Sequence, residues 1–231
     1  MNRSELHTMG LNPNPSGRSS VVEMWPSRRS QSFYDPNNGT LSRRVKCVIV
    51  GDGAVGKTSI LTTYTTGYAP AGYTPTIFDY YSANVDVDGT QVQLEICDTA
   101  GQESFTNLRT LAYANTYFFI LCFSVVDPTS FENIRTHWIS ELREQSSHAH
   151  IILVGTKTDL REAARDKGAF SISRNAARKL AKKLGASKYV ECSSLRHQGL
   201  EELFVEIGRL VVCPREPPRP NLKSRRWCFC F

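Results

Sequence analysis

Glycine, lysine and hydroxyl residues at fixed spacing in residues 51–58 indicate a site for phosphate groups. The segment reads Gly-Asp-Gly-Ala-Val-Gly-Lys-Thr and matches the pattern GxxxxGK[ST]. Glycines allow backbone N–H groups to surround phosphate oxygens, and a following helix adds positive potential. In this pattern Lys57 reaches the β- and γ-phosphates and Thr58 coordinates Mg²⁺. The predicted phosphate-binding residues are Gly51, Asp52, Gly53, Ala54, Val55, Gly56, Lys57, Thr58 and Ser59.

A second motif, Thr-Lys-Thr-Asp at residues 156–159, indicates which base accompanies the phosphates. A carboxylate accepts the N1 and N2 hydrogens of guanine, whereas adenine presents no such donor pair. Asp159 therefore predicts selection of guanine. Residues 192–195, Cys-Ser-Ser-Leu, follow another predicted strand and could offer a backbone N–H to guanine O6. The residues predicted to contact the base are Thr156, Lys157, Asp159, Leu160, Cys192, Ser193 and Ser194.

Residues 98–102, Asp-Thr-Ala-Gly-Gln, could position a water molecule that attacks the terminal phosphate. Asp98 would hold Mg²⁺ through water, the Gly101 N–H would reach the γ-phosphate, and Gln102 would orient the attacking water. The predicted catalytic residues are Gln102, Lys57 and Gly101. Together the three motifs predict hydrolysis of GTP to GDP.

Short apolar runs alternate with helical patterns and place each motif at the end of a strand. Asp-Gly at residues 88–89 predicts a hairpin. Such alternation predicts an α/β fold of the P-loop NTPase kind, with a doubly wound, six-stranded, mostly parallel sheet and helices on both faces. Ligands of such sheets bind at the carboxyl ends of the strands. The strands are predicted near 46–50, 80–87, 91–97, 117–123, 150–155 and 188–191, and helices up to 66 and at 130–145, 174–184 and 199–211.

Composition divides the 231 residues into three parts. Residues 1–44, rich in Ser, Pro, Asn and Arg, predict a disordered extension. Residues 45–213 predict one folded domain, and residues 214–231 a Pro- and Arg-rich tail. The net charge of +6 comes from the two ends, since the tail has five basic residues against one acid. The folded part is thus not expected to bind nucleic acid, whereas the tail suits an anionic surface.

Seven cysteines without a framework spacing argue against a disulfide scaffold and a structural zinc site. The first residues contain no long apolar run, so no signal peptide is expected. No apolar run in the sequence is long enough to predict a membrane span.

The tail ends in Cys228-Phe-Cys230-Phe, which satisfies the CaaX pattern with X = Phe and predicts geranylgeranylation. One lipid chain binds a membrane only marginally, and the adjoining basic residues would strengthen the attachment. Residues 214–219, Pro-Arg-Glu-Pro-Pro-Arg, fit a polyproline ligand of SH3 domains (Pro214 to Arg219) or a stiff spacer.

Taken together, the motifs at 51–58, 73–79 and 156–159 resemble the Ras superfamily and, within it, the Rho family. The N-terminal extension and the cysteine-aromatic end look most like the atypical Wrch/Chp subgroup. The resemblance covers residues 45–212 and implies a GTP-binding switch. It implies that Tyr73 and Thr76 close over the nucleotide and that Thr58, Thr76 and Asp98 are the Mg²⁺ site. The implied effector surface comprises Thr74, Pro75, Thr76, Ile77, Phe78, Asp79, Tyr80 and Tyr81.

The resemblance also implies partners and a place in the cell. These are GEF and GAP proteins, effectors such as PAK-type kinases, and control of actin, adhesion and cell shape. It implies the cytoplasmic face of the plasma membrane and endomembranes, with a cytosolic pool. It favours S-palmitoylation on Cys228, Cys230 or both over geranylgeranylation.

Two departures from the Rho pattern bear on function. Equal-length alignment places Ala69 where an aromatic ring usually rests against guanine, with Tyr68 one position earlier. Either the loop shifts and Tyr68 takes the role, or GDP is released quickly. If Tyr68 takes the role, the protein is a cycling GTPase. If GDP is released quickly, the protein is a mostly GTP-loaded signalling scaffold in which hydrolysis matters little. The segment at 161–170 is also shorter than the usual Rho insert helix, with room for one turn.

Overall fold

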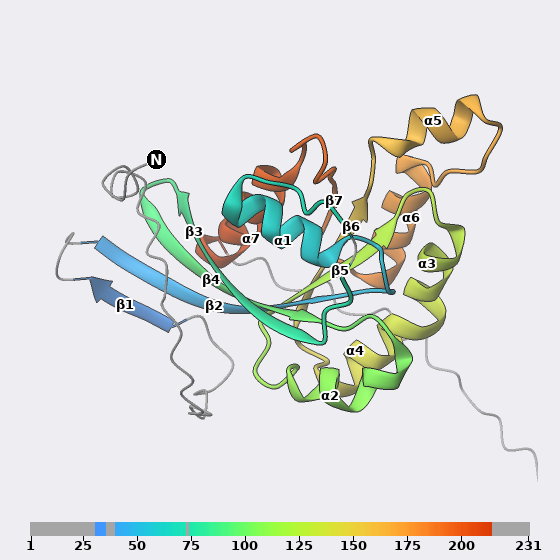
Figure 1. Ribbon diagram of the computed structural model, residues 1–231. Coiled ribbons are helices and arrows are strands. Elements are labelled where there is room, and N and C mark those ends of the chain that lie inside the picture. Colours follow the sequence, from blue (N-terminus) through green and yellow to red (C-terminus); the bar gives the residue numbers. More distant parts are fainter. Residues whose placement is uncertain (1–30, 36–39, 73, 214–231) are drawn as a thin grey trace, which may run out of the picture.

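The predicted apolar runs form the strands of one twisted sheet in the computed structural model, which describes residues 31–35, 40–72 and 74–213 (Figure 1). Six strands, the number predicted, follow the order β3-β4-β2-β5-β6-β7, and β1 pairs with β2 outside this path. All pairs are parallel except β3 with β4 and β1 with β2. The strands are β1 (Gln31–Asp35), β2 (Thr40–Val50), β3 (Phe78–Val87), β4 (Thr90–Thr99), β5 (Phe118–Ser124), β6 (His150–Thr156) and β7 (Lys188–Glu191).

The sheet begins earlier in the chain than composition predicts. β2 starts at Thr40 rather than at the predicted domain boundary, Val45, and β1 lies within the segment predicted to be disordered. Residues 42–44 of β2 pair with β4 on one side and β1 on the other. Backbone pairing therefore extends the strand beyond its apolar run. The rest of the predicted extension, residues 1–30 and 36–39, lies outside the described residues.

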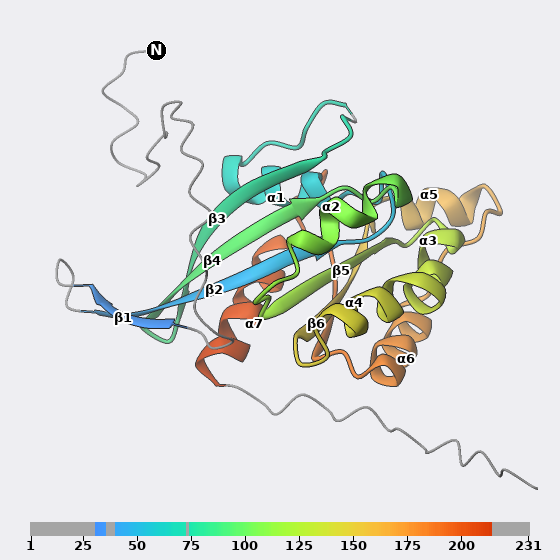
Figure 2. The same ribbon diagram turned by 90° about the horizontal axis from the view of Figure 1, so that it is seen from below.

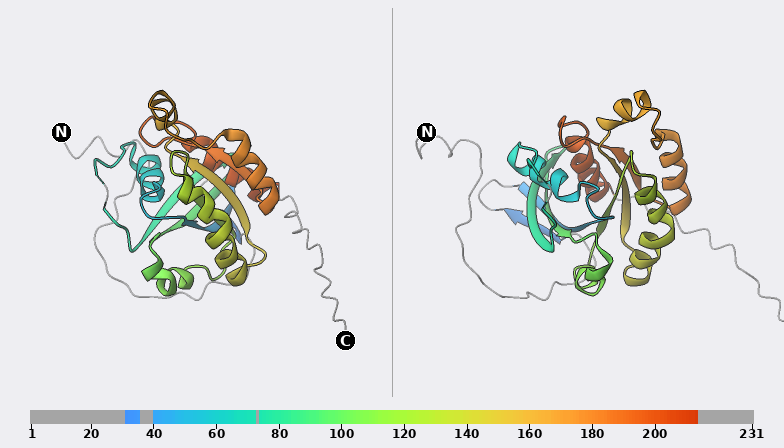
Figure 3. Two further views of the ribbon diagram at one scale, coloured as in Figure 1. Left: turned by 90° about the vertical axis from the view of Figure 1, so that its right-hand side faces the viewer. Right: turned by 45° about the vertical axis from the view of Figure 1, so that its right-hand side comes forward.

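Helices cover both faces of the sheet, as predicted (Figures 2 and 3). One face packs against α1 and α7, through residues such as Leu61 and Phe204. The other packs against α4 and α6, through residues such as Leu142 and Ala177. The helices are α1 (Lys57–Thr66), α2 (Thr106–Leu111), α3 (Pro128–Asn133), α4 (Ile139–Gln145), α5 (Leu160–Asp166), α6 (Arg174–Leu184) and α7 (Leu200–Val212), with short helical turns η2 (Glu103–Phe105) and η3 (Ile134–Trp138).

The helix predicted over 130–145 is three helical pieces in sequence. It begins at Pro128, because the Asp127 carboxylate accepts the backbone N–H of Thr129 at 3.0 Å and of Ser130 at 3.3 Å. An N-cap Asp followed by Pro is a strong start signal. Its middle, η3, has π-helical geometry, which is common near functional sites. Among the described helices, none is both long and apolar enough to cross a membrane.

Candidate functional site

The loop at residues 51–56 lies between β2 and α1, where its motif predicts it. Gly51 has φ +137°, and a Cβ there would lie 2.2 Å from the Cys122 carbonyl oxygen of β5. Only glycine therefore fits at residue 51, where the loop backbone passes directly against the backbone of β5. Lys57 Nζ donates to the carbonyls of Gly51 at 2.8 Å and Asp52 at 2.9 Å. Burial lowers the pKa of Lys57, opposed in part by the charge of Asp98.

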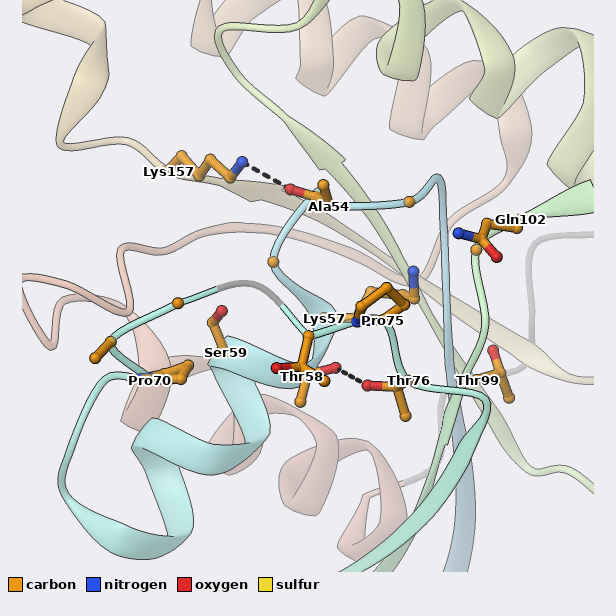
Figure 4. A pocket seen from close by; sticks show the side chains of 16 residues that line it. Ala54, Lys57, Thr58, Ser59, Pro70, Pro75, Thr76, Thr99, Gln102 and Lys157 are labelled. Atoms are coloured by element: carbon orange, nitrogen blue, oxygen red, sulfur yellow. Dashed lines mark hydrogen bonds between the residues drawn. The ribbon is translucent and has the colours of Figure 1, made fainter.

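A cavity of about 370 Å³ opens over this loop (Figure 4). Its lining joins the loop, the start of α1, residues 70–72 and 74–76, the end of β4 and Lys157. Many predicted residues line it, while Pro70, Ala71, Gly72 and Thr99 line it without having been predicted. The predicted lining residues are Gly53, Ala54, Gly56, Lys57, Thr58, Ser59, Thr74, Pro75, Thr76, Gly101, Gln102 and Lys157.

Three oxygen-bearing side chains meet beside the cavity. Thr58 Oγ1 donates to Asp98 Oδ2 at 2.5 Å. The same Thr58 oxygen lies 2.7 Å from Thr76 Oγ1 (Figure 4). Asp98 is fully buried, and its Oδ1 has no hydrogen-bond partner among the described residues. Burial raises the pKa of Asp98, opposed by the Thr58 hydrogen bond and the charge of Lys57.

This arrangement fits Mg²⁺. The buried Oδ1 of Asp98 has no hydrogen-bond partner among the described residues, and the charge of the carboxylate is compensated only in part, by Lys57 and the Thr58 hydrogen bond. Mg²⁺ is commonly held by one or two carboxylates together with phosphate and water oxygens. Over the described ranges, no cluster of three or more His, Cys, Asp or Glu side chains offers another metal site.

Gly101 lies directly against the phosphate-binding loop. A Cβ at this position would approach backbone atoms of residues 51–53 to 2.4–2.5 Å. The next residue, Gln102, is exposed and lines the cavity. Motif order alone could not show this backbone contact, since it depends on how β2 and β4 end side by side.

Arg109 is a buried residue that the motifs did not reveal. Its Nη1 donates to the carbonyls of Ala100 at 3.0 Å and Gln102 at 3.1 Å. The guanidinium is paired with Glu141 of α4, with Nη2 2.7 Å from Oε2. Tyr113 donates to the same carboxylate at 2.6 Å. Burial alone would raise the pKa of Glu141, but the Arg109 and Tyr113 hydrogen bonds lower it. The segment after β4 is thus attached to α4.

Asp52 attaches the phosphate-binding loop to the same helical region. Its Oδ1 accepts from Trp138 Nε1 at 2.6 Å and its Oδ2 from Asn133 Nδ2 at 2.7 Å. Arg109 lies 4.6 Å from the centre of the Trp138 ring, within cation–π range. The Asp52 carboxylate therefore orients the loop, while the predicted place of Asp52 in the phosphate site concerns its backbone.

The predicted base motif touches both the loop and the strand-end segment at 192–195. Lys157 Nζ donates to the Ala54 carbonyl at 2.7 Å (Figure 4), and Thr156 Oγ1 to that of Val55 at 2.5 Å. Asp159 Oδ1 accepts from Ser193 Oγ at 2.6 Å. The structure thus brings together residues 51–56, 156–159 and 192–195, which are far apart in the sequence.

Some predicted residues lie away from the cavity lining, and others lie outside the described part of the chain. Val55, Thr156, Cys192 and Ser193 are buried, and Leu160 is exposed on α5. In the predicted effector surface, Thr74, Pro75, Ile77, Asp79 and Tyr80 are exposed. Outside the described residues lie Tyr73, the Pro214 to Arg219 segment, Cys228 and Cys230.

Comparison with known families agrees with this site. A family model described as the Ras family matches residues 46–213, which is most of the chain. The protein belongs to the Ras family and has the fold and GTP-binding switch domain of that family.

We predict that Gly101→Ala weakens binding of Mg²⁺·GTP about tenfold, because the new methyl group would press on the loop backbone and overpacking costs about 1–3 kcal/mol. Titration with a fluorescent GTP analogue in the presence of Mg²⁺ measures the dissociation constant. Gly72→Ala is the matched control, since Gly72 also lines the cavity but a Cβ there meets no atom within 4 Å. Equal affinities for the two variants would contradict the prediction.

Proposed function

We propose that this Ras-family protein is a Rho-type switch that hydrolyses GTP to GDP with Mg²⁺. The observation that carries the proposal is the convergence of Thr58, Thr76 and Asp98 beside a cavity that Lys57 and Gln102 also reach. Thr76 comes from the segment before β3 and Asp98 from the end of β4, so both segments would respond to the γ-phosphate.

The side chains divide the chemistry between them. Lys57 and the backbone N–H groups of the loop would hold the phosphates, and Gln102 would orient the attacking water. Thr58, Thr76 and Asp98 would hold Mg²⁺, which offsets charge on the β- and γ-oxygens. Gly53 leaves space beside the γ-phosphate. Intrinsic hydrolysis is expected to be slow, and an arginine supplied by a GAP could accelerate it by up to about 10⁵-fold.

In the proposed Rho-type switch, residues 74–81 form the surface that binds effector proteins. Ile77 is 55% exposed and Tyr80 is 68% exposed, and Leu111 of α2 is 74% exposed. Apolar side chains left uncovered in this way favour a protein partner. We propose effectors such as PAK-type kinases, GEF and GAP regulators, and an outcome in actin, adhesion and cell shape.

The guanine assignment is tested with Asp159→Asn. An amide cannot accept two hydrogen bonds from guanine as the carboxylate can, and bonds to a charged group contribute about 1.5–3 kcal/mol each. The affinity for GDP should fall by about tenfold or more, while xanthosine diphosphate, which carries a carbonyl in place of the 2-amino group, should bind better. Isothermal titration with both nucleotides measures this; an unchanged GDP affinity would refute the assignment.

A second candidate function is a fast-exchanging switch that stays mostly GTP-loaded. Tyr68 is 79% exposed and is not part of the cavity lining, which supports the reading that it does not pack on the base. A missing aromatic contact would cost about 1 kcal/mol of nucleotide affinity. GTP would then replace GDP without a GEF, and control would rest on GAPs and on the ends of the chain.

Release of a fluorescent GDP analogue from the full chain separates the two candidates. With fast exchange, Tyr68→Ala should leave the rate unchanged and Ala69→Phe should slow it about fivefold, because a ring is restored beside the base. If Tyr68 instead contacts guanine, Tyr68→Ala speeds release and the conventional switch is supported.

We also propose that the tail attaches the protein to membranes through a lipid on Cys228, Cys230 or both, together with its basic residues. Replacing both cysteines by serine should move the protein from the membrane fraction to the cytosol. Cys213→Ser is the matched control, since that thiol is exposed at the end of α7. Membrane fractionation that survives the double substitution would contradict the lipid anchor. Binding of the Pro214–Arg219 segment to an SH3 domain is a separate proposal.

A further inference from the structure

Helix α6 has a basic outer face that the nucleotide site does not use. Its sequence, Arg-Asn-Ala-Ala-Arg-Lys-Leu-Ala-Lys-Lys-Leu, contains five cations and no acidic residue. Ala177 and Ala181 are buried against the sheet, and Leu180 and Leu184 pack beside them. Because a helix repeats every 3.6 residues, the cations lie on the side that faces away from these apolar residues. They are Arg174, Arg178, Lys179, Lys182 and Lys183, all of them exposed.

Within the described ranges, one of these cations has an acidic partner. Arg174 Nε lies 3.2 Å from Glu191 Oε2 at the start of the helix. The side chains of the other four form no ion pair and no hydrogen bond with another described residue. We refer to these four, Arg178, Lys179, Lys182 and Lys183, as the α6 basic face.

The α6 basic face has a cost that helix stability does not explain. Arg178 with Lys182, and Lys179 with Lys183, are like-charge pairs four residues apart, which destabilise a helix. The negative end of the helix dipole favours Lys182 and Lys183 in the last turn. It does not reach Arg178 and Lys179 in the middle of the helix, because the effect falls off within one turn. An anionic partner would offset the repulsion.

The end of α6 lies at the pole of the domain where the described chain ends. Shortly after α6, the Ser187 N–H donates to the Ile151 carbonyl at the start of β6 at 2.8 Å. Ser187 and Cys213 line one cavity of about 300 Å³, together with residues of the β3–β4 hairpin and the last turns of α7. The tail follows Cys213 in the sequence and therefore begins at this pole.

The tail is long enough for the domain to touch a membrane that holds Cys228. Residues 214–227 separate Cys213 from Cys228, and a chain of this length spans at most about 50 Å. Attraction between exposed charges acts over about 8 Å at physiological salt. A tether alone therefore leaves the orientation of the domain free, whereas a basic face selects the orientations that bring it against anionic lipid.

α6 lies at the opposite edge of the sheet from the proposed effector surface. It packs beside β7, the last strand in the sheet order, whereas residues 78–81 belong to β3, the first. Figures 2 and 3 show α6 and β3 on opposite sides of the domain. A membrane bound to α6 would therefore leave the β3 edge accessible to a protein partner.

We propose that the α6 basic face binds the anionic lipid surface to which the tail attaches the protein, and that it turns the β3 edge away from the lipid. The inference rests on the proposed membrane attachment of the tail, but it concerns the folded domain and is tested on protein that carries no lipid. Because the contact is electrostatic, it should weaken as the salt concentration rises.

The test measures sedimentation of the full, unlipidated chain with vesicles of phosphatidylcholine and phosphatidylserine. Arg178→Gln with Lys182→Gln should weaken binding about twentyfold, because each basic residue near an anionic leaflet strengthens binding about fivefold. The melting temperature should not fall, since the substitutions remove a like-charge pair. Unchanged vesicle binding would overturn the proposal. Lys179→Gln with Lys183→Gln should give the same loss, and it decides the question if the first variant does not fold.

Arg165→Gln with Lys167→Gln is the matched control. It removes the same charge from exposed positions at the end of α5, and its binding should stay within about twofold of wild type. An equal loss in the control would show that net charge alone matters, which would overturn the proposal.

A duplex DNA oligonucleotide is the second probe. If the α6 substitutions weaken binding of this DNA but leave vesicle binding unchanged, the face is a nucleic-acid surface and the proposal fails. A failure of the lipid anchor is seen separately, as membrane fractionation that survives replacement of Cys228 and Cys230, and it does not alter the vesicle result.

Discussion

A buried carboxylate with one unpartnered oxygen is the constraint around which this site is organised. Asp98 ends a central strand, is fully buried and receives one hydrogen bond, from Thr58. A charge in such a place is costly unless an opposite charge accompanies it. The neighbouring Lys57 supplies part of that charge but is directed to loop carbonyls. A divalent ion carried by a nucleotide would supply the rest. Thr76 lies close enough to share it, so ligand binding would tie the segment before β3 to the end of β4.

The phosphate-binding loop is attached to the rest of the domain from three directions, each through a different chemistry. Asp52 accepts from Trp138 and Asn133 on the helical side. Thr156 and Lys157 donate to its carbonyls from the end of β6. Gly101 contacts its backbone without any side chain. These contacts involve protein atoms alone, so they hold the loop in one conformation without the nucleotide. Such preorganisation reduces the conformational entropy that the loop loses when a nucleotide binds.

Sequence reasoning found the six-stranded sheet and every motif of the site because each motif is local. The glycines of the loop, the Asp-Gly hairpin and the apolar runs report directly on backbone conformation. It missed Arg109 and its partner Glu141, since a buried ion pair between distant residues leaves no local pattern. It did not predict β1 or the first residues of β2, because these strands pair through backbone groups that composition does not register. The contacts of the Asp52 side chain escaped it for a related reason: the residue lies within the motif, but its carboxylate accepts from Asn133 and Trp138, which the motif does not include.

The pairing of β1 with β2 has a consequence for how the ends of the domain are arranged. Gln31 lies opposite Arg44 in the register, and the adjacent Arg43 donates to the Val211 carbonyl in the last turn of α7 at 2.6 Å. The described chain therefore enters and leaves at one pole. The phosphate-binding loop begins at Gly51, seven residues beyond Arg44 in the sequence, a rise of about 23 Å. Because β2 carries the pairing with β1 at this pole and the phosphate-binding loop at its other end, this one strand links the two ends of the described domain directly to the nucleotide site.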